Sequence, residues 1–249
     1  MYPIPVSIML VVALCIFAFS MQRRLQILAM MKGSDRFDKM GERILSLLKF
    51  GVAQHRLIFK KDFMPGLLHA FIFWGFCTVG LQTILSFIMG FNVEFVTWFM
   101  NTPFGNVYRL VKDCVELLVV TGVLYFLVRR IFTKPSRITL SWEGVLILCF
   151  IFTLMVTDFI NDGVHYIHHG FPSSPLWGPV GIAFGHAMQS MNLSDSALAW
   201  IGGISYFLHI AIVLTFLNFL PYGKHFHVIT SLPNVFLRNL KPYGALRTI

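Results

Sequence analysis

The chain has 249 residues, of which 56% are apolar and 12% are charged, and its formal net charge is +9. A soluble chain of this length would carry about a quarter charged residues. The composition therefore excludes a soluble globular domain, as well as a disordered, collagenous or disulfide-rich chain, and indicates an integral membrane protein.

The apolar residues lie in long runs that predict five membrane-spanning helices. A bilayer core is crossed by about 20 apolar helical residues, whereas barrel strands are about ten residues long and alternate in polarity. The predicted helices cover residues 5–21, 63–91, 108–128, 142–161 and 197–227. We predict an all-α five-helix transmembrane bundle, with residues 1–233 as a single transmembrane domain and residues 234–249 as a cytoplasmic tail.

Basic residues are distributed unevenly among the predicted loops. Segment 22–62 carries ten lysines and arginines, and segment 161–196 carries none. Because basic residues collect on the cytoplasmic side, the N-terminus is predicted to lie outside and the C-terminus in the cytoplasm. The charge therefore indicates orientation in a multi-pass protein of the inner (cytoplasmic) membrane and a surface for a partner or anionic lipid, not nucleic-acid binding.

Two of the nine histidines, His69 and His209, lie well inside apolar runs. His209 and His227 are 18 residues apart, so a continuous helix would present both on one face about 27 Å apart, although Pro221 can kink it. His69 is predicted at the same depth as His227. Imidazoles at equal depth on facing helices can bind one haem iron from opposite sides; the alternative is ordinary hydrogen bonding between helices.

Sequence motifs around these histidines resemble two related families. The last predicted helix and the residues after it contain LHI (208–210), FLP (219–221), His227 and SLP (231–233). This segment resembles the last helix of the nitrate-reductase gamma-subunit family of cytochrome b membrane subunits. The runs GLLHAFIFWGF (66–76) and PYGKHFH (221–227) more closely resemble membrane domains of heterodisulfide-reductase-like iron–sulfur oxidoreductases.

The resemblance implies one or two b-type haems. His69 and His227 match the ligands of a cytoplasmic-side haem, and His209 matches one ligand of an outer haem. The nitrate-reductase pattern has a second histidine where this chain has Val79. The outer haem is therefore expected to be absent, to be five-coordinate, or to take its sixth ligand elsewhere, with His165 as the nearest substitute. The alternative prediction is a single haem bound between His69 and His209.

The beginning of the third predicted helix is unusually polar. Arg109 with Asp113 and Lys112 with Glu116 have the i,i+4 spacing of ion pairs, which predicts either simple pairing at the outer interface or a quinone site. Oxidising a quinol releases two protons and requires acid/base groups. Asp158, near the outer end of the fourth helix, is a further candidate for that site.

The resemblance implies a subunit that passes electrons between menaquinone or ubiquinone and a cytoplasmic iron–sulfur subunit of a hetero-oligomeric complex. The four cysteines are isolated, so an iron–sulfur cluster is not expected in this chain itself. Segment 22–62 and the tail are the expected contact surfaces, and a separate partner polypeptide is expected because the sequence ends at Ile249. No catalytic residue is assigned. A cofactor-free membrane anchor for a soluble redox enzyme and a small histidine-relay transporter are the competing hypotheses.

Overall fold

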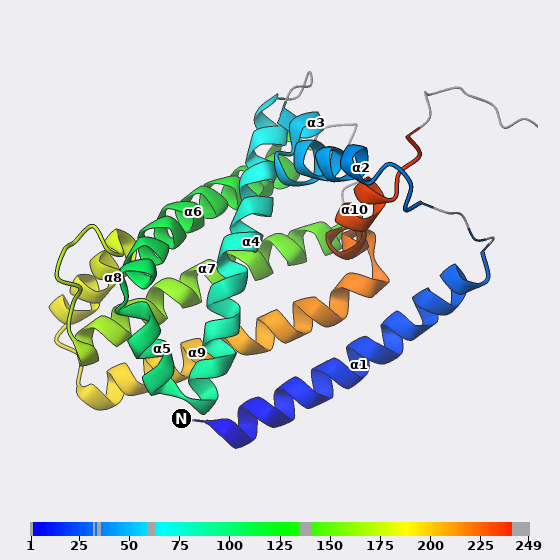
Figure 1. Ribbon diagram of the computed structural model, residues 1–249. Helices are drawn as coiled ribbons and strands as arrows, with labels where there is room; N and C mark the ends of the chain where they lie inside the picture. The colour runs from blue at the N-terminus through cyan, green and yellow to red at the C-terminus, as the bar shows by residue number, and fades with distance from the viewer. Residues whose placement is uncertain (1, 32, 34–35, 59–62, 135–140, 241–249) are drawn as a thin grey trace, which may run out of the picture.

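The computed structural model describes residues 2–31, 33, 36–58, 63–134 and 141–240, and no strand occurs among them (Figure 1). Five long helices dominate the described part of the chain. They are α1 (Pro3–Ala29), α4 (Phe63–Phe91), α6 (Pro103–Val128), α7 (Trp142–His169) and α9 (Asp195–Phe219). The all-helical prediction is confirmed for the described residues.

Four of these helices are long and apolar enough to cross a membrane: α1, α4, α7 and α9, the last extended to Tyr222. This supports a multi-pass membrane protein. The predicted third span, α6, has 26 residues but carries charged side chains in its first half, and these are buried inside the protein. Whether α6 crosses the bilayer as a fifth span, and which side each terminus faces, stay predictions.

The predicted helix 197–227 is wrong at its C-terminal end. Helix α9 ends at Phe219, and two 3₁₀ turns, η3 (Leu220–Tyr222) and η4 (Lys224–Phe226), lead into α10 (His227–Phe236). Pro221 lacks a backbone N–H and Gly223 is extended, so the helical hydrogen bonds cannot continue. His209 and His227 therefore lie on different helices, and the 27 Å rise does not apply.

Short helices gather at the two ends of the bundle (Figure 1). One end carries α5 (Val93–Met100) and α8 (Pro179–Ser190). The opposite end carries α2 (Met40–Ser46), the π turn η1 (Leu47–Val52), α3 (His55–Ile58) and α10. Because α10 runs through residue 234, the predicted domain boundary lies inside a helix, and residues 241–249 of the predicted tail lie outside the described residues.

Helices α4, α6 and α7 share the largest apolar core. Its buried members come from all three helices: Val79, Val119, Val123, Leu148, Met155 and Phe159. Val79, at the position of the second histidine in the nitrate-reductase pattern, is 7% exposed within this cluster. The structure thus gives that position a packing role between α4, α6 and α7.

A buried arginine joins the segment after α1 to the C-terminal helix. Arg43 of α2 is 1% exposed and donates to the backbone oxygens of Phe236 and Arg238, each at 2.9 Å. It also donates to the Asp38 carboxylate at 2.5 Å. Arg238 in turn donates to Ser46 Oγ at 2.8 Å. The predicted basic segment and the C-terminal region therefore form one connected surface.

Candidate functional site

His69 and His227 lie close together although 158 positions separate them in the sequence. Their ring centroids are 6.3 Å apart, with the planes tilted by 36°. Both residues are exposed, so neither imidazole is enclosed by the protein's own side chains. Two imidazoles that bind one metal ion from opposite sides, with bonds of about 2 Å, have centroids about 6 Å apart. The centroid separation of His69 and His227 therefore matches that of two imidazoles with one metal ion between them, although His225 lies at a similar distance, 6.4 Å, from His227.

Local packing positions both histidines. At Gly66, one turn before His69, a Cβ would lie 2.0 Å from the Leu57 carbonyl oxygen, so α3 packs directly against the start of α4. His227 begins α10 immediately after the turns at Pro221. Tyr222 in those turns shares a 2.6 Å hydrogen bond with Ser20 of α1. Contacts with α1 and α3 thus hold the two segments that carry the imidazoles.

His209 is buried in the middle of α9, with 2% of its surface exposed. Its Nδ1 lies 3.0 Å from Thr157 Oγ1 on α7. The Thr157 hydroxyl donates to backbone carbonyls of its own helix, at 2.9 Å for Thr153. With the hydroxyl proton used in this way, the Thr157 oxygen can accept the proton of His209 Nδ1–H. This leaves a lone pair on Nε2, which has no hydrogen-bond partner among the described residues.

A metal-binding imidazole typically donates its other N–H to a protein oxygen, which fixes the tautomer and the ring orientation. His209 has that arrangement. A buried ring nitrogen without a partner is otherwise costly, so the donor set at His209 fits an iron ligand.

His165 does not contact His209 in any hydrogen bond or ring pair of the described residues. It lies two turns along α7 from Thr157, about 12 Å by helical rise. Its ring centroid is 4.6 Å from that of His169. Both line a cavity at the α5–α8 end of the bundle. Ligation of an outer haem by His165, and the pairing of His69 with His209, stay predictions.

The polar start of α6 forms a buried charged cluster with α7. Lys112 Nζ donates to Asp158 and, at 2.7 Å, to Asp162. Glu116 lies 3.7 Å from the same nitrogen, as the i,i+4 spacing predicts, and Asp113 lies 4.0 Å away. Lys112, Asp113 and Glu116 are each 0% exposed. Lys112 and these four carboxyl groups together form the Lys112 cluster.

Arg109 and Asp113, which the sequence pattern predicts to pair with each other, each have other partners in the structure. Arg109 donates to Asn101 at 3.3 Å. Asp113 Oδ2 accepts the backbone N–H groups of Val180 and Gly181, at 2.8 and 3.1 Å, and so caps the first turn of α8. An aspartate at a helix N-terminus satisfies unpaired N–H groups and complements the helix dipole.

Asp162 is a member of the cluster that the sequence patterns did not identify. It lies four residues after Asp158 and therefore on the same face of α7, but the predicted fourth helix ends at 161. The i,i+4 spacing of two aspartates at the end of an apolar run was the signal that could have identified it.

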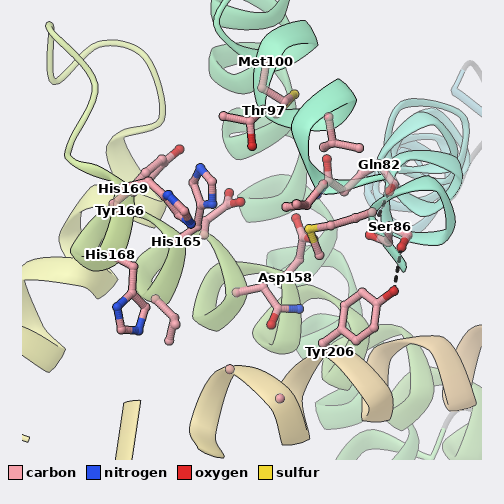
Figure 2. Close-up of a pocket in the computed structure, with 18 of the residues that line it drawn as sticks. Gln82, Ser86, Thr97, Met100, Asp158, His165, Tyr166, His168, His169 and Tyr206 are labelled. Carbon is pink, nitrogen blue, oxygen red and sulfur yellow. Dashed lines mark hydrogen bonds between the residues drawn. The ribbon is translucent and has the colours of Figure 1, made fainter. Parts of the chain in front are cut away.

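A cavity of about 360 Å³ lies beside the Lys112 cluster. Side chains from α4, α5, α7 and α9 converge on it (Figure 2). Its polar lining includes Gln82, Arg109, Asp158, Asp162 and His165. The Oε1 atom of Gln82 is buried without a hydrogen-bond partner among the described residues. The volume falls within the range of about 300–1,000 Å³ that is typical of ligand pockets.

The fold and these sites define an all-helical, multi-pass membrane protein with histidine pairs and a polar cavity between its helices. No family model and no solved structure matches the chain. The chain is 28% identical, over 95% of its length, to EtfAB:quinone oxidoreductase of Syntrophomonas wolfei. It is 27% identical, over the same share, to the probable iron–sulfur-binding oxidoreductase FadF of Bacillus subtilis.

A third relative is one of the subunits of the dihydromethanophenazine:CoB–CoM heterodisulfide reductase of Methanosarcina barkeri. It is 27% identical over 80% of this chain and 68% of its own length. The chain spans about a third of the first two relatives. These similarities support a relationship to this heterodisulfide reductase subunit and a membrane-associated redox role. The relationship to nitrate-reductase gamma subunits stays an expectation.

Proposed function

We propose that the chain is a b-type cytochrome membrane subunit that passes electrons between a membrane quinone and an iron–sulfur partner subunit on the cytoplasmic side. The observation that carries the proposal is the 6.3 Å separation of the His69 and His227 rings. Haem b held between them supplies reversible one-electron transfer. The imidazoles hold the iron, and the contacts of their helices with α1 and α3 fix their spacing.

His209 is the ligand that the chain offers to a second haem. In the tautomer in which His209 donates Nδ1–H to Thr157, Nε2 is left for the metal. A second site nearer the cavity would shorten the distance an electron travels between the cavity and the His69–His227 pair. This is the reason for proposing two haems instead of one.

The cavity is the proposed quinone site. Quinone carbonyl oxygens need hydrogen-bond donors, and Arg109 and His165 in its wall can donate. Proton exchange with a quinol needs an acid/base group at hydrogen-bonding distance, and Asp158 and Asp162 line the same space. The quinone in the name of the S. wolfei relative supports this assignment. Menaquinone and ubiquinone both suit this chemistry.

The surface formed by the connected segments α2, η1, α3 and α10 is the proposed contact for the iron–sulfur partner. Lys39, Lys49, Arg56 and Arg238 lie in or next to these segments; His227 begins α10, and α3 contacts α4, which carries His69. Positive charge there suits an acidic partner surface and speeds association. The names of the FadF and heterodisulfide reductase relatives support an iron–sulfur protein within a hetero-oligomeric complex.

Haem content tests the proposal against the competing membrane anchor. The purified chain, reconstituted with haem, is expected to contain one or two haems per polypeptide by pyridine haemochrome assay. Its haem is expected to be reduced by a short-chain quinol. A chain that folds in the membrane but binds no haem would be a cofactor-free anchor, and the proposal would then be wrong.

A further inference from the structure

The Lys112 cluster has an unusual charge balance. One ammonium group lies within 4.0 Å of four carboxyl groups, those of Asp113, Glu116, Asp158 and Asp162. The side chain of Asp162 is 13% exposed and the others are almost completely buried. Burying several unpaired charges away from water is very costly, and a buried group usually becomes neutral instead. The cluster therefore retains at least one proton.

Hydrogen bonding shows which carboxyl group is the best place for that proton. Asp113 accepts two backbone N–H groups of α8, and Asp158 and Asp162 each accept from Lys112. These bonds stabilise the ionised form. Neither oxygen of Glu116 accepts a hydrogen bond from a donor among the described residues, and its carboxyl group is instead in hydrogen-bonding contact with that of Asp158. Glu116 is thus the member of the cluster with least support for a negative charge.

Other polar groups near the cluster are engaged elsewhere. Tyr108 donates its hydroxyl to the Thr78 carbonyl oxygen at 3.0 Å. His209, which faces Asp158 from α9, uses Nδ1 to donate to Thr157. Arg109 donates to Asn101, and its guanidinium carbon lies 5.9 Å from the centre of the Tyr166 ring. None of these contacts supplies a donor to the Glu116 carboxylate.

We propose that Glu116 is a buried proton store that exchanges its proton with the cavity through Asp158 and Asp162. In each exchange the O–H bond of Glu116 breaks, and an O–H bond forms on an aspartate carboxylate in the cavity wall. The reverse transfer reloads Glu116. The Lys112 ammonium keeps its charge throughout and holds the two aspartates in place. Proton storage depends only on the cluster; its use in quinone chemistry rests on the proposed function.

Infrared spectroscopy of the full chain in detergent or lipid tests the store directly. A protonated carboxyl group has a C=O stretch distinct from that of a carboxylate. The protein is expected to show such a band at neutral pH, and Glu116→Gln is expected to remove it. Glu94→Gln, at an exposed glutamate of α5, is the matched control and should leave the band unchanged.

The unmutated chain provides a second measurement that does not depend on the folding of a variant. ¹³C-labelled glutamate should shift the band and ¹³C-labelled aspartate should not. A band shifted by aspartate, or one that persists in Glu116→Gln, would overturn the assignment. Asp162→Asn is expected to slow hydrogen–deuterium exchange of the band by about tenfold, and an unchanged rate would reject the route through the cavity wall. None of these measurements requires bound haem, so their outcome is independent of the test of the proposed function.

Discussion

Thr157 Oγ1 and His209 Nδ1 meet 3.0 Å apart between α7 and α9, both almost completely buried. When the threonine hydroxyl donates its proton to the backbone of its own helix, the histidine donates Nδ1–H to the threonine oxygen. In this tautomer, Nε2 is the nitrogen that would bind the iron of the proposed second haem.

Replacing Thr157 by valine tests this arrangement. Losing such a supporting partner typically costs about 10–100-fold in metal affinity, so Thr157→Val should weaken binding of the haem at His209 by at least tenfold. Haem titration followed by optical spectroscopy measures the change. Thr153→Val is the control, since the Thr153 hydroxyl donates to the Cys149 carbonyl oxygen and is one turn away. Equal effects of both changes would refute a role for the Thr157 hydroxyl in particular.

Filling the cavity should block quinone access without disturbing the fold. Gly203 of α9 lines the cavity, and a Cβ there would meet no atom within 4 Å. Gly203→Leu is therefore expected to lower quinol-dependent haem reduction at least tenfold while reduction by dithionite is unchanged. Gly41→Leu, at a site equally open but in α2, serves as the control. Full quinol activity in Gly203→Leu would place the quinone elsewhere.

The Lys112 cluster predicts opposite outcomes for two substitutions. Lys112→Met removes the donor of two buried carboxylates, and breaking a buried ion pair typically costs about 3–5 kcal/mol. Thermal unfolding in detergent should show a clear loss of stability. Glu116→Gln leaves a side chain whose amide can donate to Asp158, and it removes a carboxyl group that accepts no hydrogen bond among the described residues, so the unfolding temperature should be unchanged or higher.

Lys39→Met is the control for Lys112→Met. The ion pair between Lys39 and Glu42 is about 60% exposed on both sides, and such surface pairs contribute little. If the two lysine variants unfolded at the same temperature, the central position of Lys112 in the cluster would be contradicted.

Arg43 should hold the segment after α1 against the C-terminal helix. Arg43→Met removes its bonds to Phe236 and Arg238, so hydrogen exchange is expected to increase in both α2 and α10. The hydrogen bond from Arg43 holds the pKa of Asp38 below its ordinary 3.8. A depressed carboxyl pKa stabilises the fold above the unfolded pKa, and this contribution is lost as pH falls through the folded value. Protection of α2 should therefore be constant from pH 7 to 5 and decrease only below about 3.8. A decrease between pH 7 and 5 would indicate a different titrating group.

Much of the fold follows from long-range sequence patterns. Apolar run length predicts the 63–91 helix with its observed bounds, because little else in that run competes with helix formation. The end of α9 was not predicted correctly, because Pro221 and Gly223 act locally against a helical period that continues beyond them. Helices α5 and α8 are short, and their caps depend on neighbours distant in sequence, as with Asp113 at α8.

The candidate site, like the fold, could be predicted from the sequence only in part. The family resemblance pointed to His69 and His227, and the structure places their rings 6.3 Å apart, although the depth argument assumed a continuous helix, whereas α9 ends at Phe219. The separate partners of Arg109 and Asp113 could not be deduced from i,i+4 spacing, because Asn101 and the start of α8 compete for these side chains. The role of Thr157 likewise depends on which residue of α7 faces His209, a relationship that only the packing of the two helices determines.

The most direct measurement of the central claim is the reduced-minus-oxidised spectrum of haem-loaded His69→Ala and His227→Ala. Each variant is expected to lose the signal of the same haem, because each removes one of its two axial ligands. His186→Ala should retain the full signal, since His186 stacks on Phe171 at a centroid distance of 4.3 Å and has no ring contact with His69 or His227 among the described residues. A spectrum unchanged from the parent protein in both ligand variants would contradict the account.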